Sequence, residues 1–402
     1  MARRSSLLDY ARRRFRLAGS QILEFSRPWF LEVDRLQSDV EKRGGRYTSF
    51  AHYDYLGLSR HPEVLKATAA ALERYGSGAS ASRLVGGEYS VQRELETALA
   101  VFTGRGSVLA LVSGYLTNVT LLAHLLGKGD LIMYDELSHN SISVGLSASR
   151  AVSRSFRHND LDDLEGILFQ ERDRFERCLI VAESLYSMDG DLADLPRLVE
   201  IRKRHDCWLM LDEAHSIGTL GATGRGACEH FGVSPNAVDI TVATLSKTFV
   251  STGGFIAAAP EVIEWLRYTL PGFVYSVGLS PVAASTAAAA LAILTSKPER
   301  VTRLQENSSR FLQAARRKNL NLGDATGCAI IPVLMADDDS VLAASDALLK
   351  KGIFVPPVLR IGVPHDKPRL RFFVRADHTD EEIDKALDIV AASIKTPASA
   401  RP

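Results

Sequence analysis

Two apolar runs in the sequence each end in side chains that can take part in covalent or proton-transfer chemistry. The run CWLMLD at 207–212 ends in Asp212, and His215 follows three residues later. The run DITVAT at 239–244 ends in Thr244, and Lys247 follows three residues later. Taken singly, an aspartate at a strand end is often an N-cap, and a lysine is usually solvated. Together they can hold a carbonyl compound as a Schiff base beside a fixed negative charge.

Pyridoxal phosphate requires this combination of side chains. Its aldehyde needs a lysine, and its pyridine nitrogen needs a carboxylate that keeps it protonated, so that the ring can accept carbanion charge. Lys247 and Asp212 meet these needs, and His215 is a candidate for contact with the ring hydroxyl. The phosphate needs backbone amides, often at the start of a helix. The segment SGY at 113–115, which precedes a helix expected from about residue 118, predicts that phosphate site.

Seven runs from about residue 50 onward resemble one family of enzymes. They occur in that family's order: YLGL (55–58), SGYLTN (113–118), DELSH (135–139), ESLYSMDGD (183–191), LDEAHSIG (211–218), GATGRG (221–226) and TLSKTF (244–249). The runs resemble those of fold-type-I pyridoxal-phosphate enzymes and, among these, of the α-oxoamine synthases. The resemblance implies a decarboxylative condensation of an amino acid with an acyl thioester, which gives an α-amino ketone, carbon dioxide and a free thiol.

The resemblance also implies roles for the cofactor residues. Lys247 would form the Schiff base and move the proton at the amino acid's α-carbon, while Asp212 would pair with the pyridinium nitrogen. His139 would stack on the ring, although it could instead be a helix cap or a core histidine. The other expected contacts are His215 and Ser187 on the ring-hydroxyl side, Ser113, Gly114, Tyr115 and Thr244 at the phosphate, and Ser276 at the cofactor of a second subunit.

Three residues are expected to contact the substrates. Arg371 is the candidate for the substrate carboxylate, because a guanidinium can pair with a carboxylate through two hydrogen bonds. A structural ion pair is the alternative for Arg371, as a plain turn position is for Ser187. Tyr53 stands where the family usually has an asparagine, and Arg360 is out of register with an arginine of one branch of the family. These two differences concern substrate recognition and leave the reaction type unchanged.

The sequence thus predicts a C-acyltransferase with two substrates. The amino acid should be small, because the Tyr53 ring narrows the space, and the acyl donor should be an acyl-CoA or an acyl carrier protein thioester. An aminotransferase is the alternative with the same cofactor chemistry, and a catalytically silent subunit is the alternative from another class. A homodimer is expected, because Ser276 contacts the neighbouring subunit in the resemblance and twofold pairing is the commonest assembly.

The elements that position these residues alternate along the chain. Helical patterns at 62–75, 91–103 and 119–126 alternate with apolar runs at 107–111 and 240–245 and with runs ending at 134, 181 and 211. This alternation predicts an α/β fold with a mostly parallel, helix-covered sheet. A polar helix at 296–319 leads to a smaller α+β domain, with strands near 329–334, 353–355 and 370–374. The expected division is an N-terminal segment 1–60, a large domain 61–295 that binds pyridoxal phosphate, and a C-terminal domain 296–402.

The overall composition excludes some classes of function. Basic and acidic residues balance at 48 each, which gives no indication of nucleic-acid binding. The four cysteines share no metal-ligand or redox spacing, so we expect no metal and free thiols in the cytoplasm. The apolar stretch 281–294 is too short to cross a bilayer and predicts a buried helix. Six arginines between residues 3 and 16 predict an amphipathic surface helix, with a peripheral membrane or carrier-protein contact as the alternative.

Overall fold

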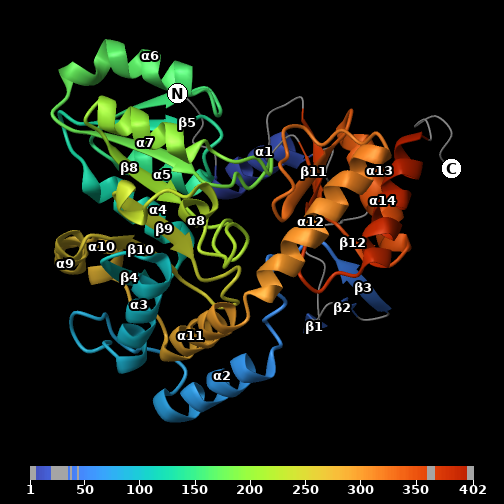
Figure 1. The fold of residues 1–402 in the computed structure, drawn as a ribbon, viewed down its shortest axis with the longest axis horizontal. Coiled ribbons are helices and arrows are strands. Elements are labelled where there is room, and N and C mark those ends of the chain that lie inside the picture. Colours follow the sequence, from blue (N-terminus) through green and yellow to red (C-terminus); the bar gives the residue numbers. More distant parts are fainter. Residues whose placement is uncertain (1–5, 20–34, 37–38, 43–44, 360–366, 396–402) are drawn as a thin grey trace.

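The computed structural model describes residues 6–19, 35–36, 39–42, 45–359 and 367–395. Figure 1 shows two lobes that are joined by a long helix, α12 (Glu299–Arg317). The larger lobe holds the seven-stranded sheet, and the smaller lobe contains most of the C-terminal part of the chain. The polar helix expected at 296–319 is confirmed as this connection.

The sheet of the large lobe is mostly parallel, as predicted. Strands β9, β8, β7, β5 and β6 pair in parallel, whereas β10 pairs antiparallel with both β4 and β9. The sequence pattern did not single out β10 as a strand. In sheet order the strands are β4 (Ser107–Leu111), β10 (Gly254–Ala258), β9 (Ile240–Thr244), β8 (Trp208–Asp212), β7 (Cys178–Glu183), β5 (Leu131–Asp135) and β6 (Val152–Phe156).

Helices cover both faces of this sheet, because its strands are apolar on both sides. In β7, Ile180 and Ala182 belong to one buried cluster, while Leu179 and Val181 belong to the other. The first cluster includes side chains of α2 (Pro62–Tyr75), α3 (Ser90–Thr103), α6 (Leu161–Glu171), α7 (Leu195–Arg204), α8 (Ala227–Phe231) and α11 (Pro281–Ser296). The second includes side chains of α4 (Gly114–Leu125), α5 (Asn140–Ala148), α9 (Pro260–Thr269) and α10 (Pro271–Val274). Helix α11 is the buried helix expected at 281–294.

The smaller lobe combines residues from about 35 to 50 with residues from the last quarter of the described chain. Its antiparallel sheet, in the order β11 (Ile330–Leu334), β14 (Arg369–Phe373) and β13 (Pro357–Val358), packs with α13 (Asp338–Lys350) and α14 (Asp380–Lys395). A second sheet joins β1 (Arg35–Leu36), β2 (Asp39–Lys42) and β3 (Gly45–Ser49) to β12 (Ile353–Phe354), and β3 pairs with β12 in parallel. Phe50 packs against Phe311 and Phe372 in the core of this lobe.

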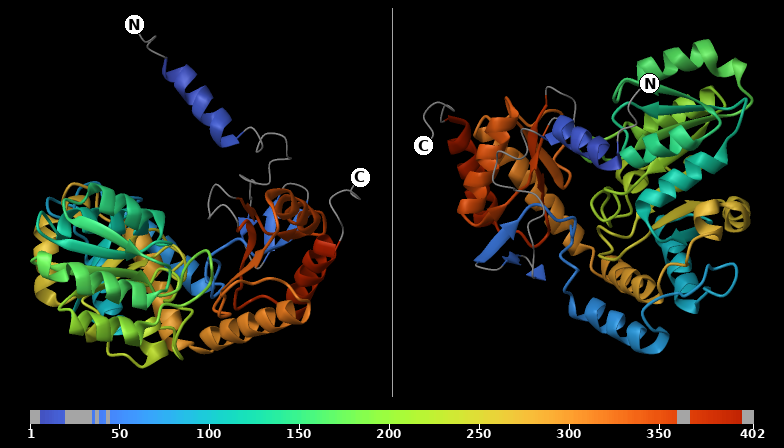
Figure 2. Two further views of the ribbon diagram at one scale, coloured as in Figure 1. Left: turned by 90° about the horizontal axis from the view of Figure 1, so that it is seen from above. Right: turned by 180° about the vertical axis from the view of Figure 1, so that it is seen from behind.

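The predicted amphipathic helix near the N-terminus is α1 (Leu7–Gly19). Figure 2 shows α1 set apart from both lobes. Leu7, Leu8 and Tyr10 on this helix are exposed. Across the described residues, no helix combines the length and the apolar character that crossing a membrane requires.

Candidate active site

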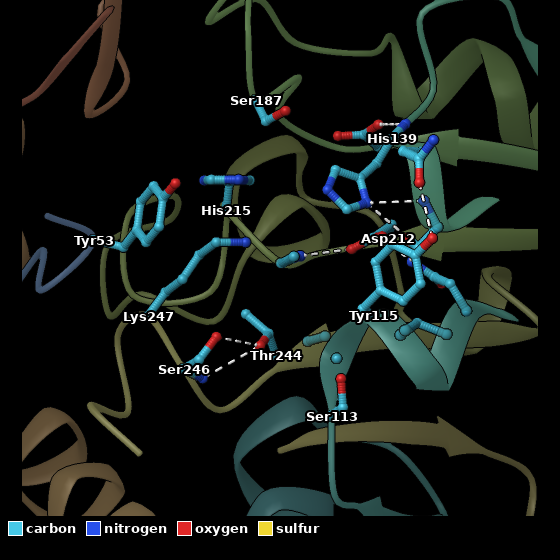
Figure 3. Close-up of a pocket in the computed structure, with 18 of the residues that line it drawn as sticks. Tyr53, Ser113, Tyr115, His139, Ser187, Asp212, His215, Thr244, Ser246 and Lys247 are labelled. Atoms are coloured by element: carbon cyan, nitrogen blue, oxygen red, sulfur yellow. Dashed lines mark hydrogen bonds between the residues drawn. The ribbon is translucent and has the colours of Figure 1, made fainter. Parts of the chain in front are cut away.

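A cavity of about 730 Å³ lies at the carboxyl ends of the parallel strands, where ligands bind on open α/β sheets. Glu183, Asp212 and Thr244, the last residues of β7, β8 and β9, all line it. The cavity brings together nearly every residue that the sequence nominated: Tyr53, Ser113, Gly114, Tyr115, His139, Ser187, Asp212, His215, Thr244, Lys247 and Arg371. Figure 3 labels all of these except Gly114 and Arg371. Ser276 is not among the lining residues, and Arg360 lies outside the residues that the structure describes.

Asp212 is held in a fixed orientation at the end of β8. The Asn118 amide donates to Asp212 Oδ2 at 2.7 Å, and the backbone N–H of Ala214 donates to Oδ1 at 2.9 Å. Asn118 also donates to the Ser141 hydroxyl at 3.0 Å, so its own position is fixed. Asp212 is buried, and its charge therefore acts strongly on any cationic group placed in the cavity.

Lys247 follows β9 and extends its amine into the cavity between Tyr53 and Asp212 (Figure 3). Nζ lies 5.7 Å from the centroid of the Tyr53 ring. Burial lowers the pKa of Lys247 to about 8, even though the charges of Asp212 and Glu183 oppose this shift. An amine with this pKa is partly neutral near pH 7, which is the form that attacks a carbonyl.

His139 caps α5 and also presents its ring to the cavity. Its Nδ1 lies 2.7 Å from the Ser141 hydroxyl, and its backbone N–H donates to Glu183 Oε1 at 2.5 Å. The ring meets that of Tyr115 edge-on, with centroids 6.2 Å apart. Burial lowers the pKa of His139, so the ring is neutral near pH 7. His139 is therefore a helix cap, and its ring also lines the cavity, where stacking on a cofactor ring would place it.

The start of α4 forms one corner of the cavity. The sequence placed this start near residue 118, but the helix begins at Gly114, because the Ser113 side chain caps it by accepting from the Leu116 N–H at 3.3 Å. The first amides of a helix lack intrahelical partners and attract anions. Thr244 packs directly on this turn, since a Cβ at Gly114 would lie 2.7 Å from Thr244 Oγ1. The Ser246 hydroxyl is 2.8 Å from the same oxygen.

His215 is buried beside Tyr55, whose hydroxyl lies 2.7 Å from His215 Nδ1. Burial lowers the pKa of His215 well below its ordinary value, and the charges of Lys247 and Arg371 add to this effect. When Nδ1 of the neutral imidazole accepts a hydrogen bond from the Tyr55 hydroxyl, the imidazole carries its own proton on Nε2. His215 can then donate a hydrogen bond into the cavity.

Arg371 reaches the cavity from β14 of the smaller lobe. Its Nη1 donates to the Ser187 carbonyl and to the Met188 sulfur, both at 2.8 Å, and its guanidinium lies 4.6 Å from the centroid of the Phe373 ring. Its Nε is buried without a hydrogen-bond partner. These contacts leave part of the guanidinium fork available to an anion.

The ion pairs around Arg371 belong to its neighbours. Arg369 pairs with Asp189 at 2.7 Å, and Arg375 pairs with Asp377 at 2.5 Å. Arg371 makes no such pair with any residue in the described part of the chain. Tyr53, which is 38% exposed, packs edge-on against Phe373 with centroids 4.6 Å apart. This part of the cavity therefore holds a guanidinium that has no ion-pair partner among the described residues and that lies beside the aromatic rings of Phe373 and Tyr53.

Comparisons with known proteins agree with this geometry. Residues 46–390 match the family described as Aminotransferase class I and II. An 8-amino-7-oxononanoate synthase of Beijerinckia indica subsp. indica is 37% identical over 358 residues, which cover 89% of this chain and 90% of the relative. A serine palmitoyltransferase of Sphingomonas wittichii has a TM-score of 0.89 at 30% identity and covers 97% of this chain and 98% of its own. A structure of SPT with PLP has the same TM-score at 28% identity and the same coverage.

The chain belongs to the α-oxoamine synthase family. Members of this family use pyridoxal phosphate to join an amino acid to an acyl thioester with loss of carbon dioxide, and this α-oxoamine synthase is an enzyme of that kind. The predicted fold type, cofactor and reaction class are confirmed.

The cavity of this α-oxoamine synthase fits pyridoxal phosphate. Asn118 Oδ1, Ser138 Oγ and Arg371 Nε are buried polar atoms on the cavity wall without hydrogen-bond partners. Because buried polar atoms are normally paired, such atoms indicate that a polar ligand binds here. The cavity also offers a nucleophilic lysine, a fixed carboxylate and a helix start, which are the three groups that the cofactor needs.

Two residues of the site were not assigned a role from the sequence, although both lie in the quoted runs. Asn118 orients Asp212, and Glu183 accepts the His139 backbone N–H. Burial and the nearby Asp212 charge raise the pKa of Glu183 to about 8. The rule that polar residues at strand ends face ligands selects Glu183, because it is paired directly with Asp212 across β7 and β8. No comparable local signal selects Asn118, which lies within a helix.

Proposed function

We propose that this α-oxoamine synthase condenses a small amino acid with an acyl-CoA or acyl carrier protein thioester, releasing an α-amino ketone, carbon dioxide and the free thiol. The observation that supports it most is the meeting of Lys247, Asp212 and Arg371 in one cavity, with Arg371 unpaired by any carboxylate in the described part of the chain.

Bound pyridoxal phosphate supplies an electron-accepting ring that stabilises negative charge at the amino acid's α-carbon. Asp212, held by Asn118, keeps a proton on the ring nitrogen, and its burial strengthens this interaction. The Lys247 amine holds the cofactor and then accepts the α-proton, a role that suits a pKa of about 8. Arg371 binds the amino acid's carboxylate and thereby directs its α-carbon toward Lys247.

The remaining cavity residues hold the cofactor in place. We assign the phosphate to the start of α4 with Ser113, Gly114 and Tyr115, and to Thr244. His215 and Ser187 face the ring-hydroxyl side, and the neutral His139 ring covers one face of the cofactor plane. Because His139 and His215 both remain uncharged near pH 7, neither competes with the ring nitrogen for the Asp212 charge.

We also propose that the enzyme is a homodimer with Ser276 facing the partner's cofactor. Ser276 lies between Tyr275 and Val277, which are 87% and 55% exposed. This segment is tied to a second exposed loop, because the Gly278 N–H donates to the Ala81 carbonyl at 2.9 Å, and Val85 on that loop is 85% exposed. Adjacent exposed apolar side chains of this kind favour a protein interface.

We further propose that the substrates are a small amino acid and an apolar acyl chain and that the enzyme is cytoplasmic. The Tyr53 ring narrows the space beside Lys247 and Arg371, which favours glycine, alanine or serine as the amino acid. Arg360 is out of register with the arginine of one branch of the family, so a partner for a carboxylate on the acyl chain is missing, which favours an apolar chain. The four cysteines are free thiols in the structure, which supports a reducing cytoplasm. Peripheral membrane contact through α1 remains secondary, because only its own arginines and exposed leucines support it.

The experiment that tests this function is a screen of amino acids against acyl thioesters. Free thiol would be measured by a colorimetric thiol reagent and product mass by mass spectrometry, with Lys247→Ala as the inactive control. Thiol release with an α-amino ketone supports the proposal. A keto acid formed without thiol release, or no product from any pair of a small amino acid with an acyl-CoA or acyl carrier protein thioester, would overturn the proposal.

A further inference from the structure

His158 is not among the residues that line the cavity, but it bonds two of the segments whose neighbouring residues do. It follows β6, and its Nδ1 lies 2.8 Å from Asp135 Oδ1 while its Nε2 lies 2.9 Å from Asp191 Oδ2. Both carboxylates are buried. A carboxylate only accepts hydrogen bonds, so both ring nitrogens must donate, and the imidazole must carry a positive charge. Burial alone lowers the pKa of His158, but the bonds to Asp135 and Asp191 outweigh it and raise the pKa to about 10.

The first arm of this contact leads to His139. Asp135 is the last residue of β5, and its Oδ1 accepts the Leu137 N–H at 2.9 Å while its carbonyl accepts the Ser138 N–H at 3.0 Å. These bonds shape the short turn that ends at His139. A shift of Asp135 would therefore move the His139 ring relative to the cavity.

The second arm leads to the turn that holds Arg371. The Tyr186 N–H donates to the Asp191 carbonyl at 3.0 Å, which closes the turn containing Ser187 and Met188. Those two residues accept from Arg371 Nη1. Asp191 thus fixes, through this turn, where the guanidinium of Arg371 points.

A neutral His158 ring could not keep both of its hydrogen bonds, to Asp135 and to Asp191. A neutral imidazole donates only one hydrogen bond, so one of the two buried carboxylates would lose its bond to the ring and face an unprotonated ring nitrogen. Asn159 supports the same contact, because its side-chain amide donates to Asp191 Oδ2 at 2.5 Å and its backbone N–H donates to Asp135 Oδ2 at 2.9 Å, but both of these donors are neutral. In the described structure His158 is the side chain that bonds both acids.

We propose that His158 is a positioning residue, a charged clamp that holds the turn at 135–139 and the turn at 186–191 in register, so that His139 and Arg371 face the same bound cofactor and amino acid. The clamp acts through other residues and touches neither substrate nor cofactor. The expected effect of His158 on amino-acid binding rests on the proposed function, whereas its expected effect on cofactor binding does not.

The test uses the holoenzyme with two variants, His158→Gln and Asp191→Asn. The matched control is His205→Gln, because His205 also faces a carboxylate (Glu165 at 3.4 Å) but precedes β8, at the opposite edge of the sheet. The measurements are the dissociation constant of pyridoxal phosphate, the visible circular dichroism of the bound cofactor, the KM of each substrate, and the melting temperature.

For His158→Gln we expect an amino-acid KM about tenfold higher, a cofactor dichroism reduced to about half or less, and a thioester KM within about twofold of wild type, since misplacing a binding group by about 1 Å can cost up to 100-fold. Asp191→Asn should raise the amino-acid KM and reduce the cofactor dichroism to a smaller extent. His205→Gln should leave both quantities at their wild-type values.

A lower melting temperature with wild-type dichroism, cofactor affinity and amino-acid KM in both variants would overturn the proposal, because His158 would then only stabilise the fold. If His158→Gln does not fold, Asp191→Asn decides the question by the same criteria. Cofactor dichroism and affinity need no turnover. A wild-type enzyme that makes no amino ketone would therefore refute the proposed function and leave the clamp to be judged by the cofactor measurements.

Discussion

Replacing Arg371 with alanine tests whether this side chain binds the amino acid's carboxylate. In the structure Arg371 Nη1 donates to Ser187 and Met188, the Tyr53 side chain also interacts with the guanidinium, and Nε is buried without a hydrogen-bond partner. Substrate bound in the cavity of Arg371→Ala would keep its carboxylate without a charged partner, which costs about 2–5 kcal/mol. A loss of about 2.7 kcal/mol corresponds to roughly a hundredfold weaker amino-acid binding.

The assay is a titration of the holoenzyme with the amino acid, followed by the visible absorbance of the bound cofactor. The dissociation constant should rise about a hundredfold, while the affinity for pyridoxal phosphate stays within about twofold, because Arg371 lies on the substrate side. Arg371→Lys should be intermediate, since lysine keeps the charge but loses the planar fork. Arg310→Ala, which removes a surface pair with Asp384, is the matched control and should bind normally.

An unchanged amino-acid dissociation constant in Arg371→Ala would refute this reasoning. Arg371 would then serve only to hold the turn at Ser187, and Arg360 would become the next candidate for the substrate carboxylate. A parallel loss of affinity for cofactor and amino acid would likewise contradict the assignment, because it would show that the whole cavity had collapsed.

Borohydride reduction of the purified yellow enzyme should attach the cofactor to Lys247, as found by peptide mass spectrometry, and label on another lysine would contradict the site. Because burial lowers the pKa of Lys247 to about 8, the amine is neutral above that pH. Cofactor capture by the apoenzyme should therefore accelerate with pH and level off above about 8, and a rise that continues to pH 10 in stopped-flow absorbance would disprove this. Sedimentation should show a dimer, and Tyr275→Asp should weaken it. Phe169→Asp changes a similarly exposed aromatic side chain on α6 and should leave the dimer intact. A fully active monomer would contradict the proposed dimer. An alkyl thioester should have the higher kcat/KM, and a preference of about tenfold or more for a dicarboxylic chain of equal length, about 1.4 kcal/mol, would contradict the inference from Tyr53 and Arg360.

The local patterns of the sequence were sufficient to predict that Asp212, Thr244 and Lys247 lie close together. Asp212 and Thr244 end strands β8 and β9 as the apolar runs indicated, and Lys247 follows in the same loop region. A buried strand ends where its apolar run ends, and the carboxyl ends of parallel strands share one edge of the sheet. These residues therefore come together whatever the details of the intervening helices.

Features that depend on distant parts of the chain could not be predicted in this way. The contact of Asn118 with Asp212 and the bridge from Asp135 through His158 to Asp191 exist only because the sheet order places these segments side by side. The start of α4 was expected too late, because Gly114 and its neighbours are poor helix formers. The Ser113 cap outweighs that low propensity.

The pairing of β3 with β12 has a consequence for how the chain is made. Residues Gly45–Ser49 leave the ribosome early, but their parallel partner Ile353–Phe354 is synthesised only about 300 residues later. At roughly 5–20 residues per second, this strand edge waits about 15–60 s before it can be paired. Phe50 stays unpaired for a similar time, because Phe372, whose ring centroid lies 5.6 Å from that of Phe50, is synthesised even later. A nascent chain that stops short of residue 353 therefore carries an open β-edge at Gly45–Ser49 and an uncovered aromatic side chain at Phe50, where a chaperone or a second nascent chain can reach them first.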